Sequence, residues 1–79
     1  MFEFEITWKL DGNWENIDRE VNRIVGNKHN VASGGGFGQR DLTAGGYRTP
    51  VRAEEVRAKV KLIKGVKCSK VREEEKELD

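Results

Sequence analysis

The sequence is poor in the residues that hold small secreted domains together. It contains a single cysteine, Cys68, so no disulfide can form within the chain. Small secreted domains commonly depend on disulfides, and their absence therefore favours a reducing, cytoplasmic setting. The N-terminus alternates acidic and aromatic residues and lacks the basic and apolar regions of a signal peptide, so we expect a complete, untargeted chain. No apolar run approaches the ~20 residues of a membrane-spanning helix.

Ligand sets for metals and nucleotides are missing as well. His29 and Cys68 are the only residues of their kinds, and a structural zinc site needs about four suitably spaced ligands. The glycine run at residues 34–38 departs from the dinucleotide-binding pattern because Gln39 follows it, and no Gly-Lys-Ser/Thr sequence marks a phosphate loop. No Ser-His-Asp set or paired carboxylates stand out. We therefore expect no metal, no cofactor and no enzymatic activity.

A chain of 79 residues is long enough for one small domain. Domains of this size bury roughly 60% of the surface that the unfolded chain exposes, so nearly every apolar residue is needed in the core. Only 35% of the residues are apolar, while 37% are charged. This composition leaves little room for a catalytic cavity beside a complete core.

The first ten residues show the clearest pattern of secondary structure. Apolar and polar residues alternate from Phe2 to Leu10, which predicts a strand with one apolar and one polar face. A polar face is typical of a sheet that is open to water on one side. We expect Ile6 on this strand and Val21 on the first helix to be buried where the two elements pack together.

Two segments carry apolar residues at helical spacing. Residues 14–25 predict the first helix, and Gly26 ends it where a left-handed conformation is favoured. The second helix begins at Thr49-Pro50, which is typical of an N-cap followed by proline at the first helical position. Leu62 falls on the far side of this helix, opposite a stripe that consists of Ala53, Val56, Val60 and Ile63.

The remaining segments predict three more strands. Residues 27–47 contain six glycines and indicate an antiparallel hairpin with its turn between Gly34 and Asp41. Val66, Cys68 and Val71 lie among the basic residues Lys67, Lys70 and Arg72, as in an edge strand. The domain therefore covers residues 1–72, and we expect residues 73–79 to be an acidic, disordered tail.

The resulting order is β-α-β-β-α-β. An α+β chain of this order, with both helices on one face of a four-stranded antiparallel sheet, is a ferredoxin-like plait. The crossover connections would place the first and third strands at the centre of the sheet and the second and fourth at its edges.

The net charge of +1 conceals blocks of different sign. Residues 48–72 carry 9 basic and 2 acidic side chains, whereas residues 73–79 carry 1 and 5. Such a basic segment can hold nucleic acid or another anionic partner, and its candidate residues are Arg52, Arg57, Lys59, Lys61, Lys64 and Lys67. We prefer a solvated surface whose lysine stems cover the core edge, because no aromatic residue lies between Arg48 and Asp79 to stack on bases.

These features favour a small non-enzymatic protein-interaction or regulatory module, of the accessory-subunit or inhibitor type. The alternative is a nucleic-acid or anionic-ligand binder that acts through residues 52–72. We expect a protein partner or self-association, because a glycine-rich edge strand leaves pairing surface unused. No membrane or metal partner is expected. The candidate partner contacts are Phe37, Arg40 and Leu62.

Overall fold

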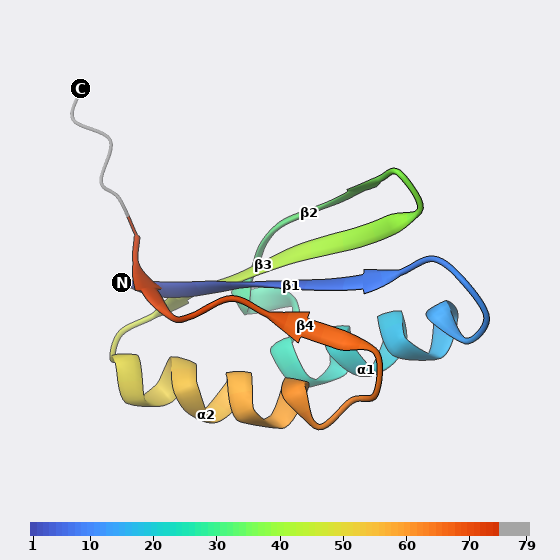
Figure 1. Ribbon diagram of the computed structural model, residues 1–79. Coiled ribbons are helices and arrows are strands. Elements are labelled where there is room, and N and C mark those ends of the chain that lie inside the picture. The colour runs from blue at the N-terminus through green and yellow to red at the C-terminus, as the bar shows by residue number, and fades with distance from the viewer. Residues whose placement is uncertain (75–79) are drawn as a thin grey trace.

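The computed structural model describes residues 1–74 and has the predicted α+β architecture. An antiparallel sheet forms one layer, and both helices cover the same face of it (Figure 1). The helices are α1 (Trp14–Val25) and α2 (Pro50–Lys61), with a short 3-10 helix, η1 (Asn27–His29), after α1. The strands are β1 (Phe2–Lys9), β2 (Asn30–Gly36), β3 (Gln39–Tyr47), β4 (Val66–Cys68) and β5 (Arg72–Glu73).

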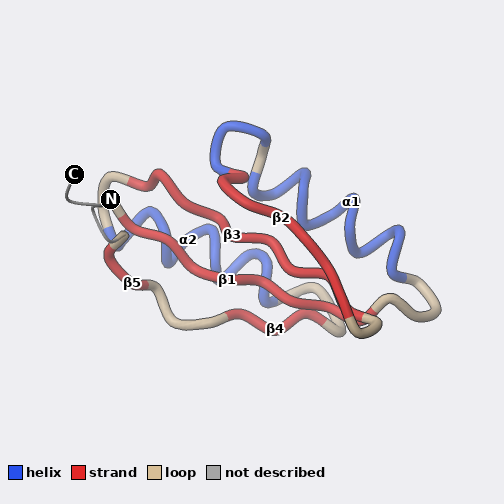
Figure 2. The backbone as a smooth tube through the Cα atoms, turned by 90° about the horizontal axis from the view of Figure 1, so that it is seen from above, coloured by secondary structure: helices blue, strands red, loops and turns tan. Residues whose placement is uncertain are grey.

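The strand order confirms the predicted plait. It runs β2-β3-β1-β4, so β1 and β3 are central and β2 and β4 lie at the edges. One strand was not predicted: β5 pairs with the beginning of β1, where Phe2 lies opposite Glu73. Figure 2 shows β4 and β5 following one another along the same side of β1. They are two parts of one edge, interrupted at residues 69–71.

Strand β1 supplies the middle of the core. Phe4 and Ile6 are fully buried and Trp8 is 2% exposed, because alternate residues of a strand share one face and the helices cover that face. The predicted strand is one residue too long. Leu10 lies beyond the end of β1 and is 38% exposed, because the chain has already begun to turn towards α1.

The helices contribute the other side of the core. Val21 of α1 has no exposed surface, like Ile6 of β1, and the two elements are in contact, which confirms the predicted packing. The predicted cap of α2 is also confirmed, since the Thr49 side chain accepts a hydrogen bond from the Arg52 backbone N–H at 3.1 Å. The buried stripe of α2 consists of Ala53, Val56 and Val60.

The hairpin between β2 and β3 turns where the sequence predicts. Phe37 and Gly38 form its two-residue loop, and both have positive φ, 54° and 78°. Two residues with positive φ give the turn a twist that matches the flanking strands. Further along β3, Gly45 and Gly46 form a bulge opposite Glu3, and Gly46 adopts φ 78°. Bulges of this kind favour glycine because other residues are strained at positive φ.

The ordered domain extends past the predicted boundary at residue 72. Glu73 pairs with β1, and the Glu74 backbone N–H donates a hydrogen bond to the Met1 carbonyl at 2.7 Å. The physical reason is that the beginning of β1 offers an open edge to the returning chain. The rest of the predicted tail, residues 75–79, lies outside the described residues.

We predict that Ile6→Ala lowers the free energy of unfolding by ~2–5 kcal/mol, because it leaves a cavity between the sheet and the helices. Val51→Ala is the control, because Val51 is 66% exposed on α2 and its truncation should change stability by less than about 0.5 kcal/mol. Urea denaturation followed by circular dichroism measures both. Similar losses in the two variants would contradict this description of the core.

Candidate functional site

The edge formed by β2 is the most open part of the sheet. The strand pairs with β3 on one side only, and residues 31–36 are all exposed; we call them the β2 edge. From Asn30 to Gln39 the chain contains no charged residue and no proline. Proteins usually block exposed edges with such residues, because an unpaired row of backbone N–H and C=O groups can pair with another strand.

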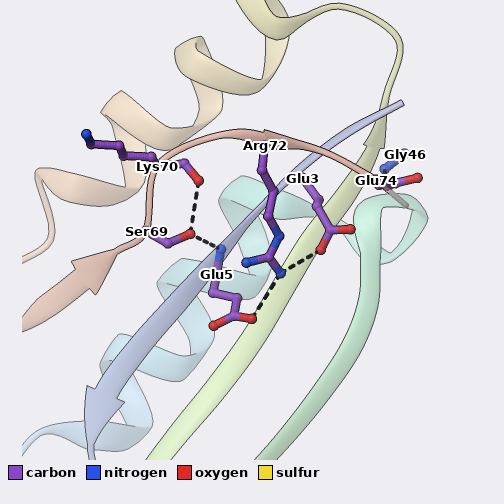
Figure 3. A network of polar contacts seen from close by, with 7 residues as sticks. All are labelled: Glu3, Glu5, Gly46, Ser69, Lys70, Arg72 and Glu74. Carbon is purple, nitrogen blue, oxygen red and sulfur yellow. Dashed lines mark hydrogen bonds and ion pairs between the residues drawn. The ribbon is translucent and has the colours of Figure 1, made fainter. Parts of the chain in front are cut away.

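The opposite edge of the same sheet is closed to pairing. Between β4 and β5, Ser69 replaces a regular ladder contact, because its hydroxyl accepts a hydrogen bond from the Glu5 N–H at 2.8 Å (Figure 3). Arg72 bridges Glu3 and Glu5 across the polar face, with N–O distances of 2.9 and 3.0 Å. Lys67 adds a further charge to this edge, in the middle of β4. The interruption and the charges together discourage a partner strand.

Phe37 marks the tip of the hairpin, next to the β2 edge. Its side chain is fully exposed, and its φ of 54° is uncommon for any residue other than glycine. A bulky residue in the left-handed region is strained, and asparagine, aspartate or glycine is the usual choice in such a turn. An exposed aromatic side chain beside an open strand edge fits the predicted role as a partner contact.

The two other predicted contacts lie elsewhere. Arg40 is on the helix-facing side of β3, and its Nε lies 3.2 Å from Asp18 Oδ1 of α1, so it links the sheet to a helix. Leu62 is 86% exposed just after α2, a helix that contacts β4 at the closed edge. The structure therefore does not bring Phe37, Arg40 and Leu62 together on one surface.

The basic segment does not form one surface either. Lys67 lies opposite Thr7 in the ladder, on the open face of the sheet, whereas α2 lies on the other face (Figure 1). Arg57 donates a hydrogen bond to the Ser69 carbonyl at 2.7 Å and supports the edge, while Arg52 pairs with a helix neighbour, Glu55, at 3.1 Å. The exposed basic residues that remain in the helix layer are Lys59, Lys61 and Lys64.

His29 and Cys68 each pack against other residues of the domain. The His29 ring stacks on Tyr47 with a centroid distance of 4.3 Å, and its Nδ1 donates a hydrogen bond to the Gly45 carbonyl at 2.8 Å. This contact was not predictable from local sequence patterns, because its two residues are 16 positions apart. Cys68 lies opposite Ile6 and is half-buried; burial raises the pKa of its thiol, while the charges of Arg57 and Lys61 act in the opposite direction.

The structure shows few other candidate sites. Residues 1–74 contain no group of three or more His, Cys, Asp or Glu side chains that could hold a metal ion. No helix in that part of the chain is long and apolar enough to cross a membrane. Comparisons with protein-family models, curated proteins and solved structures gave no match.

Two features of the sequence mark the β2 edge, its glycine content and its lack of charge, and the prediction used only the first. Glycine content indicated an edge strand and left its register open, but the absence of charge from Asn30 to Gln39 also distinguishes this edge from the basic one at β4. Comparing the charge of the two predicted edge strands would have identified the open side of the sheet.

We predict that native Cys68 reacts with iodoacetamide at pH 8 several-fold more slowly than the urea-unfolded chain, because burial raises the pKa of the thiol and limits access. Because the pKa is higher in the folded chain, folding is more favourable when the thiol is neutral than when it is ionised. The stability that it contributes is therefore present below about pH 8.5, the pKa of a free cysteine, and declines as the pH rises through the folded pKa. Equal rates in the native and unfolded chains would contradict this.

Proposed function

We propose that this chain is a non-enzymatic protein-interaction module that acts by strand addition at the β2 edge. The observation that carries the proposal is the contrast between the two edges of one sheet. The β2 edge presents exposed, uncharged residues, while the other edge is interrupted and charged. Natural proteins block the edges that must not pair, so an edge without charge or proline is suited to a partner.

The chemistry of strand addition matches the composition of β2. In this mode of recognition the affinity comes from backbone hydrogen bonds, and side chains add specificity. Gly34, Gly35 and Gly36 have no side chains to obstruct a second backbone. Phe37, exposed at the end of the strand, provides an apolar anchor of the kind that is enriched at interfaces.

The partner that we propose is a second copy of this chain. Two β2 edges related by a twofold axis would pair antiparallel, so that the unpaired backbone N–H and C=O groups of each edge would bond to those of the other. The absence of charge from Asn30 to Gln39 means that no like charges would face each other across the axis. The two sheets would then continue into one, with each copy's closed edge on the outside.

The module belongs to the regulatory or accessory class in this proposal. Its single cysteine is half-buried and forms no disulfide, which suits the reducing environment of the cytoplasm. Assembly through β2 leaves the polar face of the sheet and the exposed side of the helices free. These surfaces remain available to the larger complex or the target that an accessory subunit or inhibitor would contact.

Sedimentation velocity tests the proposal with a matched pair of variants. Gly34 suits substitution, because a Cβ added there meets nothing within 4 Å. Gly34→Lys places one lysine of each copy near the twofold axis, and this like-charge pair, which repels by up to about 1 kcal/mol, should weaken dimerisation by up to about fivefold. Gly34→Ala, the control, adds a side chain without charge and should remain dimeric.

A wild-type chain that stays monomeric at several hundred micromolar would overturn pairing with a second copy. Equal dissociation constants for Gly34→Lys and Gly34→Ala would show that the dimer forms through another surface. Circular dichroism confirms that each variant is folded, and both substitutions face open space.

A further inference from the structure

A basic hollow lies at the end of the sheet, where β3 leads into α2. Its volume is about 460 Å³, and three cationic side chains line it: Lys28, Arg48 and Arg52. No acidic residue is among the lining residues. Lys28 comes from η1, Arg48 from the connection after β3, and Arg52 from α2, so the fold brings Lys28 beside two charges from a distant part of the sequence.

The positive end of a helix adds to this charge. Helix α2 has 12 residues and begins beside Thr49, which also lines the hollow. The Thr49 hydroxyl already accepts the Arg52 N–H, and Pro50 has no N–H to donate. Val51 therefore carries the open backbone donor of the first turn. The N-terminus of a helix favours an anion through such donors and through the helix dipole.

A buried hydroxyl group in the same place lacks a partner. Tyr47 lines the hollow and is 1% exposed, and its hydroxyl makes no hydrogen bond among residues 1–74. Burial raises the pKa of this phenol, and the charge of Arg52 opposes the rise. An unsatisfied buried hydroxyl is costly, and a ligand that accepts its hydrogen bond would remove the cost.

One residue that lines the hollow also contacts a carboxylate outside it. Gly46, a lining residue, donates its backbone N–H to Glu74 Oε1 at 2.7 Å. Glu74 thus occupies one donor and brings a negative charge to the border of the hollow, and Arg52 shares its guanidinium with Glu55. Among the lining side chains, Lys28 and Arg48 are the cations that have no carboxylate partner within residues 1–74.

We propose that the basic hollow is a binding site for a doubly charged oxyanion, the phosphate group of a small molecule. Lys28 and Arg48 supply the charge, the Val51 N–H and the Tyr47 hydroxyl donate hydrogen bonds, and the helix dipole favours the negative ligand. Arginine is well suited to this role because its planar group can donate two parallel hydrogen bonds to phosphate. This site is distinct from the β2 edge and does not depend on it.

Titration with inorganic phosphate, followed by ¹H–¹⁵N NMR, tests the proposal. Sodium chloride at matched ionic strength corrects for general screening, and sodium acetate tests whether a single carboxylate suffices. We expect saturable shifts of the Arg48, Thr49 and Val51 amides with phosphate, and at least tenfold weaker binding of acetate, because the second charge makes the ligand's contacts stronger.

Charge-neutralising variants identify the cations that bind. Lys28→Gln with Arg48→Gln should weaken phosphate binding at least tenfold, because charge-assisted hydrogen bonds are lost. Lys61→Gln with Lys64→Gln is the control; it removes the same charge from exposed positions outside the hollow and should change the affinity by less than about twofold. Glu74→Gln removes the neighbouring negative charge and should strengthen binding.

Three results would overturn the proposal. The first is amide shifts that follow ionic strength and are the same with phosphate and chloride. The second is an equal loss of affinity in the two double variants, which would indicate general attraction to a basic chain. The third is saturable binding whose shifts fall outside the hollow. Because all four substituted basic residues are exposed, unchanged thermal stability is expected to accompany each variant.

Discussion

The burial of one face of β1 is the constraint on which the rest of the structure depends. Phe4, Ile6 and Trp8 lie on that face, and together they fill the space between the sheet and two helices. A shift of one residue in register would turn all three towards water, so the hydrophobic pattern fixes the position of β1. Because β1 pairs with β3, β4 and β5, its position also determines where the other strands can lie.

The same constraint accounts for the difference between the two edges. The C-terminal segment returns to β1 and closes that side with Ser69, Arg72 and Glu74, whose polar contacts reach β1 and the glycine bulge of β3 (Figure 3). Strand β2 has no neighbour beyond it in the described chain. Its glycines have no side chains that could shield the edge, so the backbone stays accessible. This is why we place the interaction surface there.

The parts of the fold that follow local rules were predictable from the sequence. The alternation in β1, the stripe of α2 and the Thr49 cap each depend on neighbouring residues. The start of α1 does not follow such a rule: Asn13 directly precedes the helix, yet with φ −93° and ψ 23° its side chain caps no backbone N–H and instead accepts a hydrogen bond from the Asn16 side chain. An extended residue is the usual geometry for such a cap.

Contacts between distant segments were beyond prediction. Arg40 reaches α1, and Tyr47 lies beside His29, because the sheet register brings these residues together. A single sequence shows residue types and spacing, whereas the register of a glycine-rich hairpin depends on packing. For this reason the sequence predicted β2 as a glycine-rich edge strand but did not predict its register. The basic hollow was missed entirely, since its cations come from three separate elements.

Hydrogen exchange along β2 tests the central claim most directly. If the β2 edge pairs with a second copy, amides of residues 31–36 that point away from β3 should exchange more slowly as the protein concentration rises. Amides of β4 should be unaffected, because that edge stays closed. Exchange rates along β2 that are independent of concentration from ten to several hundred micromolar would contradict the account.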